Sequence, residues 1–263
     1  MESDTHVMES GTMEVYVIGS GTGVPSLKRG SPGTVVKIGD SIMLLDSGPG
    51  TLRQLLKVDI DFRDIEYLLY SHLHPDHISE LVPFLFASQY GSEEKRKKNL
   101  CIVGPVGIAA FHQRLKQAYG RWIAPQNYQL DIMEITDGDL SFTDFTLQGF
   151  PLLHSNHSVG YRLKSAEGKV VSYSGDTDYC PNLIELAKGV DLLILECSLP
   201  DDMKIDGHLT PSLAGRVARE TGCKRLLLTH FYPPCDKCDI AGIVKEQYKG
   251  EVVLAEDLMK IIV

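Results

Sequence analysis

Short apolar runs alternate with amphipathic stretches along the chain, and together they predict a regular series of strands and helices. Runs rich in aliphatic and β-branched residues predict strands at 14–18, 34–38, 42–45, 65–70, 100–103, 132–135, 142–150, 169–173, 191–195 and 225–229. Apolar residues at helical spacing predict helices at 78–90, 106–119, 181–188 and 213–221, and a further helix that begins at 51. Strands and helices that follow one another in this way are typical of an α/β protein.

Length and composition indicate how this series is organised. The 263 residues, 43% of them hydrophobic, are enough for one large core. We expect a flexible N-terminal tail at 1–12 and a single domain at 13–263. The tail is polar and acidic, and no charge-free apolar stretch approaches the length of a bilayer span. These features predict a cytoplasmic protein with no membrane partner.

The charge balance narrows the expected partners. There are 26 Lys and Arg against 35 Asp and Glu, a net charge of -9, so we expect no broad nucleic-acid surface. One cationic stretch, at 93–98, is open to two interpretations. It is either a solvated turn or a basic patch for RNA, and its two adjacent glutamates favour the turn.

The six cysteines have no regular framework spacing and indicate reduced thiols. Cys235 and Cys238 form a lone C-x-x-C pair. Such a pair can bind a structural metal or form a redox couple, but without a second pair the coincidental spacing of a loop is favoured.

The richest chemistry lies in the loop after the apolar run 67–70. His72, His74, Asp76 and His77 crowd into six positions. Neutral imidazole and carboxylate together suit zinc, manganese or iron. His72 and His74 lie two apart on extended backbone and project the same way, whereas Asp76 and His77 follow a proline and can face elsewhere. The loop therefore predicts a metal site, with a histidine-rich polar loop as the alternative.

Other polar side chains follow strands far away in the sequence. Asp46 ends an apolar strand, where an unpaired carboxylate is costly to bury, so it must contact backbone amides, a histidine N–H or a metal centre. Asp176 follows a strand-end glycine, and Asp178 lies where it can cap the helix at 181–188. His230 also ends a strand, and His208 precedes a helix. Carboxyl-end positions of this kind predict ligands that gather along one edge of the sheets.

These motifs resemble those of a known family. The His-x-His-x-Asp-His loop is similar to the signature of the metallo-beta-lactamase fold superfamily, and the glycine-rich turn at 19–25 is similar to that of its ribonuclease-Z-like branch. The resemblance implies a four-layer αββα sandwich, in which two mixed sheets are flanked by helices. It also implies two divalent metal ions, with zinc expected and manganese or iron as alternatives.

The resemblance assigns a role to each site residue. It implies that Asp176 bridges the ions and that Asp46 orients the histidine ligands. His154 is favoured over His157 as a ligand, because its spacing to the Gly-Tyr-Arg that follows is similar to that in the branch. His157 remains a substrate contact or a surface residue. The implied ligands of one ion are His72, His74 and His154, and those of the other are Asp76, His77 and His230.

The resemblance also implies a reaction. A metal-bridging hydroxide would hydrolyse an ester, with Asp76 orienting the nucleophile and His208 acting as general acid or charge stabiliser. His208 favours a phosphodiesterase. The alternatives are tRNA 3′ processing by a ribonuclease Z, or hydrolysis of a thioester, lactone or sulfate ester. A homodimer is expected only by analogy.

The spacing of two ligands bears on the substrate. Asp176 follows His154 by only 22 positions, too few for the long arm with which bacterial-type ribonuclease Z grips tRNA. We therefore expect a small phosphodiester or a short nucleotide as substrate. The loop cations Lys28 and Arg29 are either solvated or in contact with a substrate anion.

Overall fold

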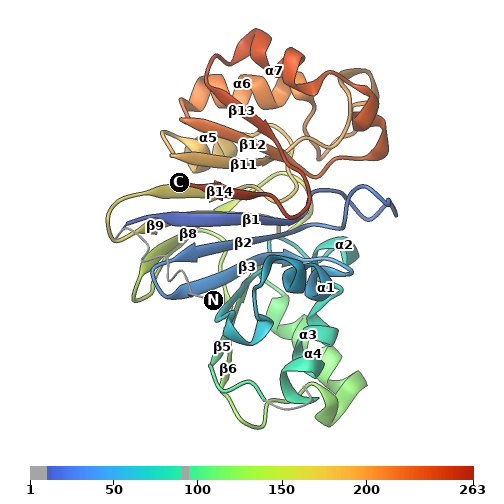
Figure 1. The fold of residues 1–263 in the computed structure, drawn as a ribbon, viewed down its shortest axis with the longest axis vertical. Helices are drawn as coiled ribbons and strands as arrows, with labels where there is room; N and C mark the ends of the chain where they lie inside the picture. Colours follow the sequence, from blue (N-terminus) through green and yellow to red (C-terminus); the bar gives the residue numbers. More distant parts are fainter. Residues whose placement is uncertain (1–10, 91–94) are drawn as a thin grey trace, which may run out of the picture.

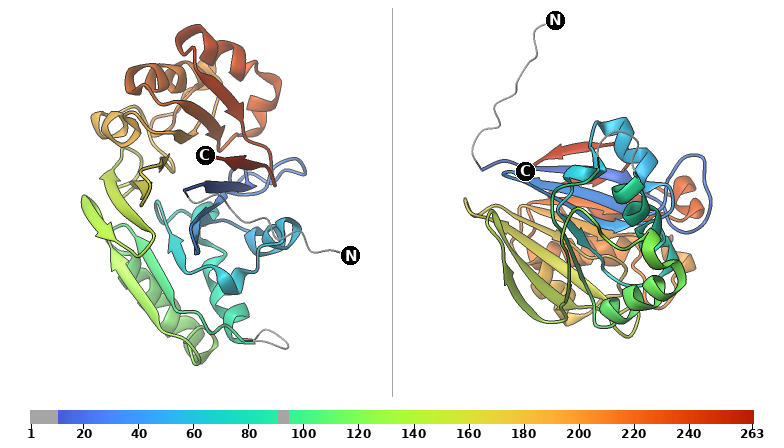
Figure 2. Two further views of the ribbon diagram at one scale, coloured as in Figure 1. Left: turned by 60° about the vertical axis from the view of Figure 1, so that its left-hand side comes forward. Right: turned by 90° about the horizontal axis from the view of Figure 1, so that it is seen from below.

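The computed structural model describes residues 11–90 and 95–263, which form two β-sheets that pack face to face (Figure 1). Most of the expected N-terminal tail, together with Glu93 and Glu94, lies outside the described residues. Helices cover the outer face of each sheet, as Figure 2 shows from two further directions. The predicted four-layer αββα sandwich is confirmed.

The first sheet has seven strands in the order β14-β1-β2-β3-β4-β5-β6. The pairs from β14 to β3 are antiparallel, and those from β3 to β6 are parallel. The bounds of its strands are β1 Met13–Gly19, β2 Gly33–Ile38, β3 Ser41–Ser47, β4 Tyr67–Leu69, β5 Leu100–Gly104, β6 Leu130–Glu134 and β14 Lys260–Ile262.

The second sheet repeats this plan with the order β13-β12-β11-β10-β9-β8-β7. The strands from β13 to β10 are parallel, and those from β10 to β7 are antiparallel. The bounds are β7 Gly138–Ser141, β8 Phe145–Pro151, β9 Val159–Ser165, β10 Val170–Tyr173, β11 Leu192–Glu196, β12 Arg225–Thr229 and β13 Glu251–Leu254.

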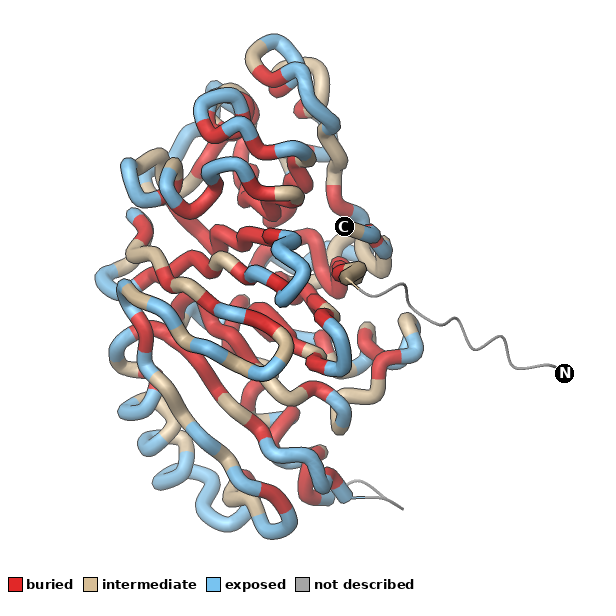
Figure 3. Tube along the Cα trace, turned by 90° about the vertical axis from the view of Figure 1, so that its left-hand side faces the viewer, coloured by how far each residue is buried: buried red, intermediate tan, exposed pale blue. Residues whose placement is uncertain are grey.

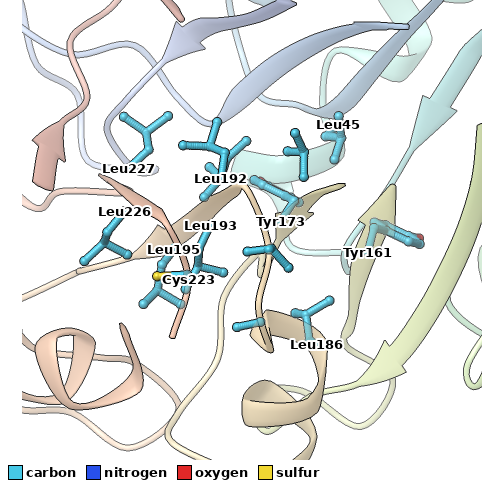
Figure 4. Close-up of a cluster of buried hydrophobic side chains, with 14 of the residues drawn as sticks. Leu45, Tyr161, Tyr173, Leu186, Leu192, Leu193, Leu195, Cys223, Leu226 and Leu227 are labelled. Carbon is cyan, nitrogen blue, oxygen red and sulfur yellow. The ribbon is translucent and has the colours of Figure 1, made fainter. Parts of the chain in front are cut away.

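The alternation of side chains along a strand explains the layers. In β3, Met43 and Leu45 point into the core between the sheets, whereas Leu44 packs with the residues beneath the helices. Figure 4 shows members of the inter-sheet core from both sheets, including Leu45 and Tyr173. Strands that are covered on both faces have continuous apolar sequences. Figure 3 shows that buried residues are concentrated along the strands.

Two groups of helices complete the sandwich. The helices that cover the first sheet are α1 Thr51–Leu55, α2 Pro75–Ile78, α3 Leu81–Tyr90 and α4 Ile108–Tyr119. Those that cover the second sheet are α5 Pro181–Ala187, α6 Pro211–Thr221 and α7 Ile240–Gln247. No helix among the described residues is long and apolar enough to cross a membrane.

The structure corrects several expected boundaries. The strand expected at 142–150 begins only at Phe145, as β8. The residues before it form a turn, in which the amide of Phe142 donates to the carbonyl of Phe145 and which separates β7 from β8. The helix expected at 78–90 is divided into α2 and α3. The solvated turn expected at 93–98 is wrong for Arg96, which is only 1% exposed. Its guanidinium donates to backbone carbonyls of Phe62, Ile65, Lys98 and Asn99.

Candidate metal centre

The parallel strands of both sheets end at one edge, and the polar residues predicted from the sequence gather there. Asp46 lies at the end of β3, and the histidine loop follows β4. Asp176 follows β10, and His230 follows β12. Ligand sites form at the carboxyl ends of parallel strands because the strands deliver their following loops to the same edge.

Three imidazoles and one carboxylate form the first cluster, consisting of His72, His74, His154 and Asp176. Nδ1 of His74 lies 3.1 Å from Nε2 of His154. Asp76, His77 and His230 form a second cluster, in which the Nε2 atoms of His77 and His230 are 3.2 Å apart. The potential ligand atoms of each cluster lie within 4.8 Å of one another.

Asp176 lies between the two clusters and presents one oxygen to each. Its Oδ1 is 3.3 Å from Nε2 of both His77 and His230. Its Oδ2 is 3.8 Å from Nε2 of His72 and 3.6 Å from Nε2 of His154. This is the placement expected of a carboxylate that bridges two cations.

Hydrogen bonds on the far side of the rings determine their tautomers. Nδ1 of His77 is 2.8 Å from the Asp46 carboxylate, and Nδ1 of His154 is 2.9 Å from the carbonyl of Gly207. A carboxylate or carbonyl oxygen can only accept, so each Nδ1 carries the proton. The Nε2 lone pairs of both rings therefore point toward Asp176.

Serine hydroxyls relay the same constraint to two further rings. The Ser71 hydroxyl donates to Asp46, so it accepts from Nδ1 of His72 at 3.0 Å. The Ser198 hydroxyl donates to Glu196 and accepts from Nδ1 of His230 at 2.9 Å. In the neutral form of these rings, Nε2 therefore carries no proton and faces Asp176. The four such imidazoles are His72, His77, His154 and His230.

Bare nitrogens this close together repel unless a cation lies between them, so these residues fit a metal site. Nε2 of His72 and Oδ1 of Asp176 are buried without a hydrogen-bond partner. Burial lowers the pKa of His72 to about 2, which keeps this ring neutral and able to bind a metal. Burial also opposes protonation of His77, but Asp176 and Asp46 raise its pKa well above the ordinary value. The carboxylates thus favour positive charge at this position, which either a proton on His77 or a bound cation would supply.

Asp46 is the centre of the hydrogen bonds behind the first sheet's histidines. It is fully buried and accepts from the amide and hydroxyl of Ser71, from His77 and, at 2.6 Å, from the hydroxyl of Tyr173. Of the partners expected for this carboxylate, the structure shows a backbone amide and a histidine N–H, and its role in orienting metal ligands stays a prediction. Ser71 is also approached by Gly175, where a Cβ atom would lie 2.4 Å from the serine Cβ.

Glu196 is the counterpart of Asp46 in the second sheet, and no role was predicted for it from the sequence. This 1% exposed carboxylate ends β11 and accepts from the hydroxyl of Ser198 and the amides of Thr177 and Leu209. Nδ1 of His208 lies 3.0 Å from its Oε1. The signal was available, since a carboxylate at the end of an apolar strand needs partners wherever it occurs.

His208 lies beside the clusters, grouped with Asp176 and His230. Burial lowers the pKa of His208, but the hydrogen bond and charge of Glu196 outweigh burial and raise it above the ordinary value. The contact with Glu196 engages Nδ1, so Nε2 is the nitrogen available to a substrate. The ring planes of His208 and His230 are 14° from parallel, with centroids 5.8 Å apart.

The expected capping role of Asp178 is wrong. Cys180 is the N-cap residue of α5, and Asp178 instead holds the loop that carries His208. Its Oδ2 accepts from the amide of Gly207 at 2.9 Å and from Nζ of Lys204 at 2.7 Å. Because the Gly207 carbonyl contacts His154, Asp178 links this loop to the first cluster.

The remaining candidates are members of neither cluster. His157 is exposed and is in neither of them. Lys28 and Arg29 both pair with Asp236, which leaves neither fully solvated. Burial raises the pKa of Cys235 to about 12 and also raises that of Cys238, which disfavours the thiolate that a metal or redox reaction needs.

One cavity of about 480 Å³ lies away from this chemistry. It opens beside the starts of β4 and β5, where Glu66, Tyr67 and Phe142 contribute to its lining. A small cavity of about 10 Å³ lies directly beneath the clusters, against Asp176 and Glu196. We assign the chemistry to the clusters because the converging bare nitrogens are there.

The arrangement agrees with what the chain is similar to. Residues 42–231 match the family model described as the beta-lactamase superfamily domain. The chain is 28% identical to ribonuclease BN of Cronobacter sakazakii, over 83% of this chain and 89% of that protein. It is 30% identical to the probable metallo-hydrolase YhfI of Bacillus subtilis, over 93% of this chain and 97% of that protein.

Solved structures give the same result. The Bacillus subtilis protein YhfI, described as a metallo-beta-lactamase fold protein, superposes with a TM-score of 0.82 at 27% identity, covering 96% of this chain and 100% of that one. The short form of human tRNase Z gives 0.78 at 26% identity, covering 94% and 98%. The chain belongs to the beta-lactamase superfamily and has the metallo-beta-lactamase fold.

Proposed function

We propose that the protein is a phosphodiesterase that depends on two divalent metal ions. The observation that carries the proposal is the position of Asp176, whose two oxygens face two separate sets of bare imidazole nitrogens. The proposed ligands of one ion are His72, His74 and His154, those of the other are Asp76, His77 and His230, and Asp176 is shared.

The donor set suits zinc, with manganese or iron as alternatives, because imidazole and carboxylate bind all three. Bound there, such cations would act as Lewis acids and provide a hydrolytic nucleophile near neutral pH. Asp46 and Glu196 orient the ligand rings through Ser71 and Ser198. Positioning bonds of this kind commonly decide how well a ligand set holds its metal.

His208 is the proposed general acid. As the phosphorus–oxygen bond to the leaving group breaks, Nε2 of His208 gives its proton to the departing oxygen and the ring becomes neutral. Glu196 stabilises the protonated ring before this step, since it raises the His208 pKa. Asp76 accepts from the amide of Gly23 at 2.9 Å, which holds its carboxylate where it can orient the attacking water.

The chain between His154 and Asp176 supports a small substrate. It contains the end of one loop and the hairpin of β9 and β10, which turns at 166–169. A short hairpin offers no long arm for a folded RNA. We therefore propose small phosphodiesters or short nucleotides as substrates.

Processing of tRNA 3′ ends is a second candidate, favoured by the relatives. Ribonuclease Z of Archaeoglobus fulgidus is 26% identical over 94% of this chain, and the short form of human tRNase Z shares the fold. The short hairpin argues against this candidate, and a direct assay of cleavage of a precursor tRNA decides it.

A substrate panel tests the proposal. The holoenzyme is assayed with bis(4-nitrophenyl) phosphate, a thioester, a lactone, a sulfate ester and a precursor tRNA, each with added zinc or manganese. We expect selective turnover of the phosphodiester, abolished by a chelator. Turnover of the thioester, lactone or sulfate ester alone would overturn the phosphodiesterase proposal.

A further inference from the structure

The charge of the chain is distributed unevenly. Residues 95–130 contain seven Lys and Arg and no Asp or Glu, although the whole chain has a net charge of -9. The remaining residues carry 19 cations against all 35 carboxylates. The expectation of no broad nucleic-acid surface rested on net charge, which does not reveal this local concentration.

Most of these cations are free to meet a ligand. Two of the seven are already engaged. Arg96 is buried, with its guanidinium bonded to carbonyls, and Nζ of Lys98 lies 3.6 Å from Oε2 of Glu66. The others are exposed and have no ion pair within the described part of the chain, and they are Lys95, Lys97, Arg114, Lys116 and Arg121. They lie on α4, on the turn after it, and before β5.

An exposed aromatic cluster occupies the same region. Phe86 and Tyr90 of α3 and Trp122, which follows α4, are 44%, 41% and 45% exposed. Their ring centroids are 4.8 Å apart for Phe86 and Tyr90 and 5.6 Å for Tyr90 and Trp122. The guanidinium of Arg121 lies 4.8 Å from the centre of the Trp122 ring.

We infer that this aromatic cluster, with the cations around it, binds a single-stranded nucleic acid. Exposed rings stack on bases without regard to sequence, and the cations attract the phosphates. Neither feature alone would be specific, but the rings of α3 lie against Trp122 of the acid-free segment, and this combination matches what a flexible strand offers. The inference rests on the proposed phosphodiesterase, whose substrates it extends to oligonucleotides.

The position of the cluster agrees with this role. Helix α3 follows α2, which carries Asp76 and His77, and the ten residues of α3 span about 15 Å. Phe86 and Tyr90 lie in the far half of this helix, which lies beside α4 (Figure 1). A strand of several nucleotides could contact the cluster while one of its phosphodiesters reaches the metal clusters.

Charge disfavours a second copy of the chain as the occupant. A two-fold interface places the same patch on both partners, so the cations would face one another. An anionic membrane would satisfy the cations and the rings, but it would not use the metal clusters at the other end of α3. Measurements of self-association and of vesicle binding distinguish these two occupants from a nucleic acid.

Trp122 is the only tryptophan, so its fluorescence reports directly on this surface. The holoenzyme is titrated with a thymidine 12-mer that has hydrolysis-resistant phosphorothioate linkages, at several salt concentrations. We expect saturable quenching that weakens as salt rises, because bound cations release counterions from the strand. Tyr90→Ala should weaken binding about tenfold through lost stacking.

A matched pair of triple variants isolates the patch from net charge. Arg114→Glu, Lys116→Glu and Arg121→Glu together should weaken binding by about a hundredfold. Lys188→Glu, Arg219→Glu and Lys245→Glu change the net charge equally on the exposed helices of the second sheet, and should leave binding within about twofold. Equal effects of the two triple variants, or no quenching, would overturn the inference.

Two further measurements distinguish the rivals. Quenching by phosphatidylserine vesicles but not by the 12-mer would assign the patch to membranes, and self-association that Tyr90→Ala abolishes would assign it to a dimer. Hydrolysis of bis(4-nitrophenyl) phosphate by every patch variant should match the parent. If hydrolysis persists while the 12-mer fails to bind, the strand-binding inference falls and the proposed phosphodiesterase stands.

Discussion

Nδ1 of His208 lies 3.0 Å from Oε1 of Glu196, a buried carboxylate at the end of β11. The contact occupies Nδ1 and leaves Nε2 available on a ring that is grouped with Asp176 and His230. It also raises the pKa of the ring despite its burial. A histidine held in this way is suited to give up a proton to a leaving group.

The leaving group should therefore control the effect of His208→Ala. We expect a loss in kcat of about 10²- to 10⁴-fold for a phosphodiester with an alkyl or nucleoside leaving group. With 4-nitrophenolate, which leaves readily without a proton, the loss should be much smaller. Exposed His157→Ala is the matched control. Equal losses for both leaving groups would remove His208 from proton transfer.

Glu196→Gln should move the pH profile in a known direction. Glu196 raises the pKa of His208, so the parent keeps its general acid protonated to a higher pH. Without that charge, the alkaline limb of kcat against pH should shift to lower pH. Metal content is measured on the same sample, because Glu196 also contacts Ser198. An unmoved limb at full metal content would contradict the assigned role.

Much of the site could be predicted because its ligands follow strand ends, and strand ends are visible as breaks in apolar runs. His72, Asp176 and His230 were located in this way, and the structure brings them together. Glu196 was missed although its context matches that of Asp46. Its partner His208 is twelve residues away, and only the tertiary fold shows that they meet.

Other features depend on packing that the sequence pattern does not encode. Arg96 lies in a cationic stretch that is typical of a solvated turn, yet four carbonyls and the ring of Tyr128 enclose it. Asp178 precedes a helix at a spacing that favours capping, but the His208 loop supplies better donors. Helix α7 and strands β7, β9, β13 and β14 were not predicted, although α7 is no shorter than α5.

Asp46→Asn should weaken metal binding while preserving shape. An amide nitrogen cannot accept, so at least one bond from Ser71, His77 or Tyr173 is lost. We expect metal affinity to fall by about 10- to 100-fold, measured by competition with a chromogenic chelator. Asp191→Asn, which affects contacts with Val170 and Lys224 away from the site, is the control. Unchanged affinity would show that Asp46 does not orient the ligands.

Arg96→Ala should destabilise the fold. The buried guanidinium satisfies several carbonyls, which would lose their partner, so the free energy of unfolding should fall by roughly 2 to 4 kcal/mol. Lys97→Ala, at the adjacent exposed position, should change it by less than about 0.5 kcal/mol. Denaturant unfolding measures both, and similar values for the two variants would disprove the structural role of Arg96.

We propose above all that a pair of cations occupies the space around Asp176. The most direct test is to measure metal per chain by mass spectrometry, and to locate the ions by anomalous scattering from crystals. We expect two equivalents, one beside His72, His74 and His154 and the other beside Asp76, His77 and His230. A metal-free protein that hydrolyses phosphodiesters equally well with and without a chelator would contradict the claim.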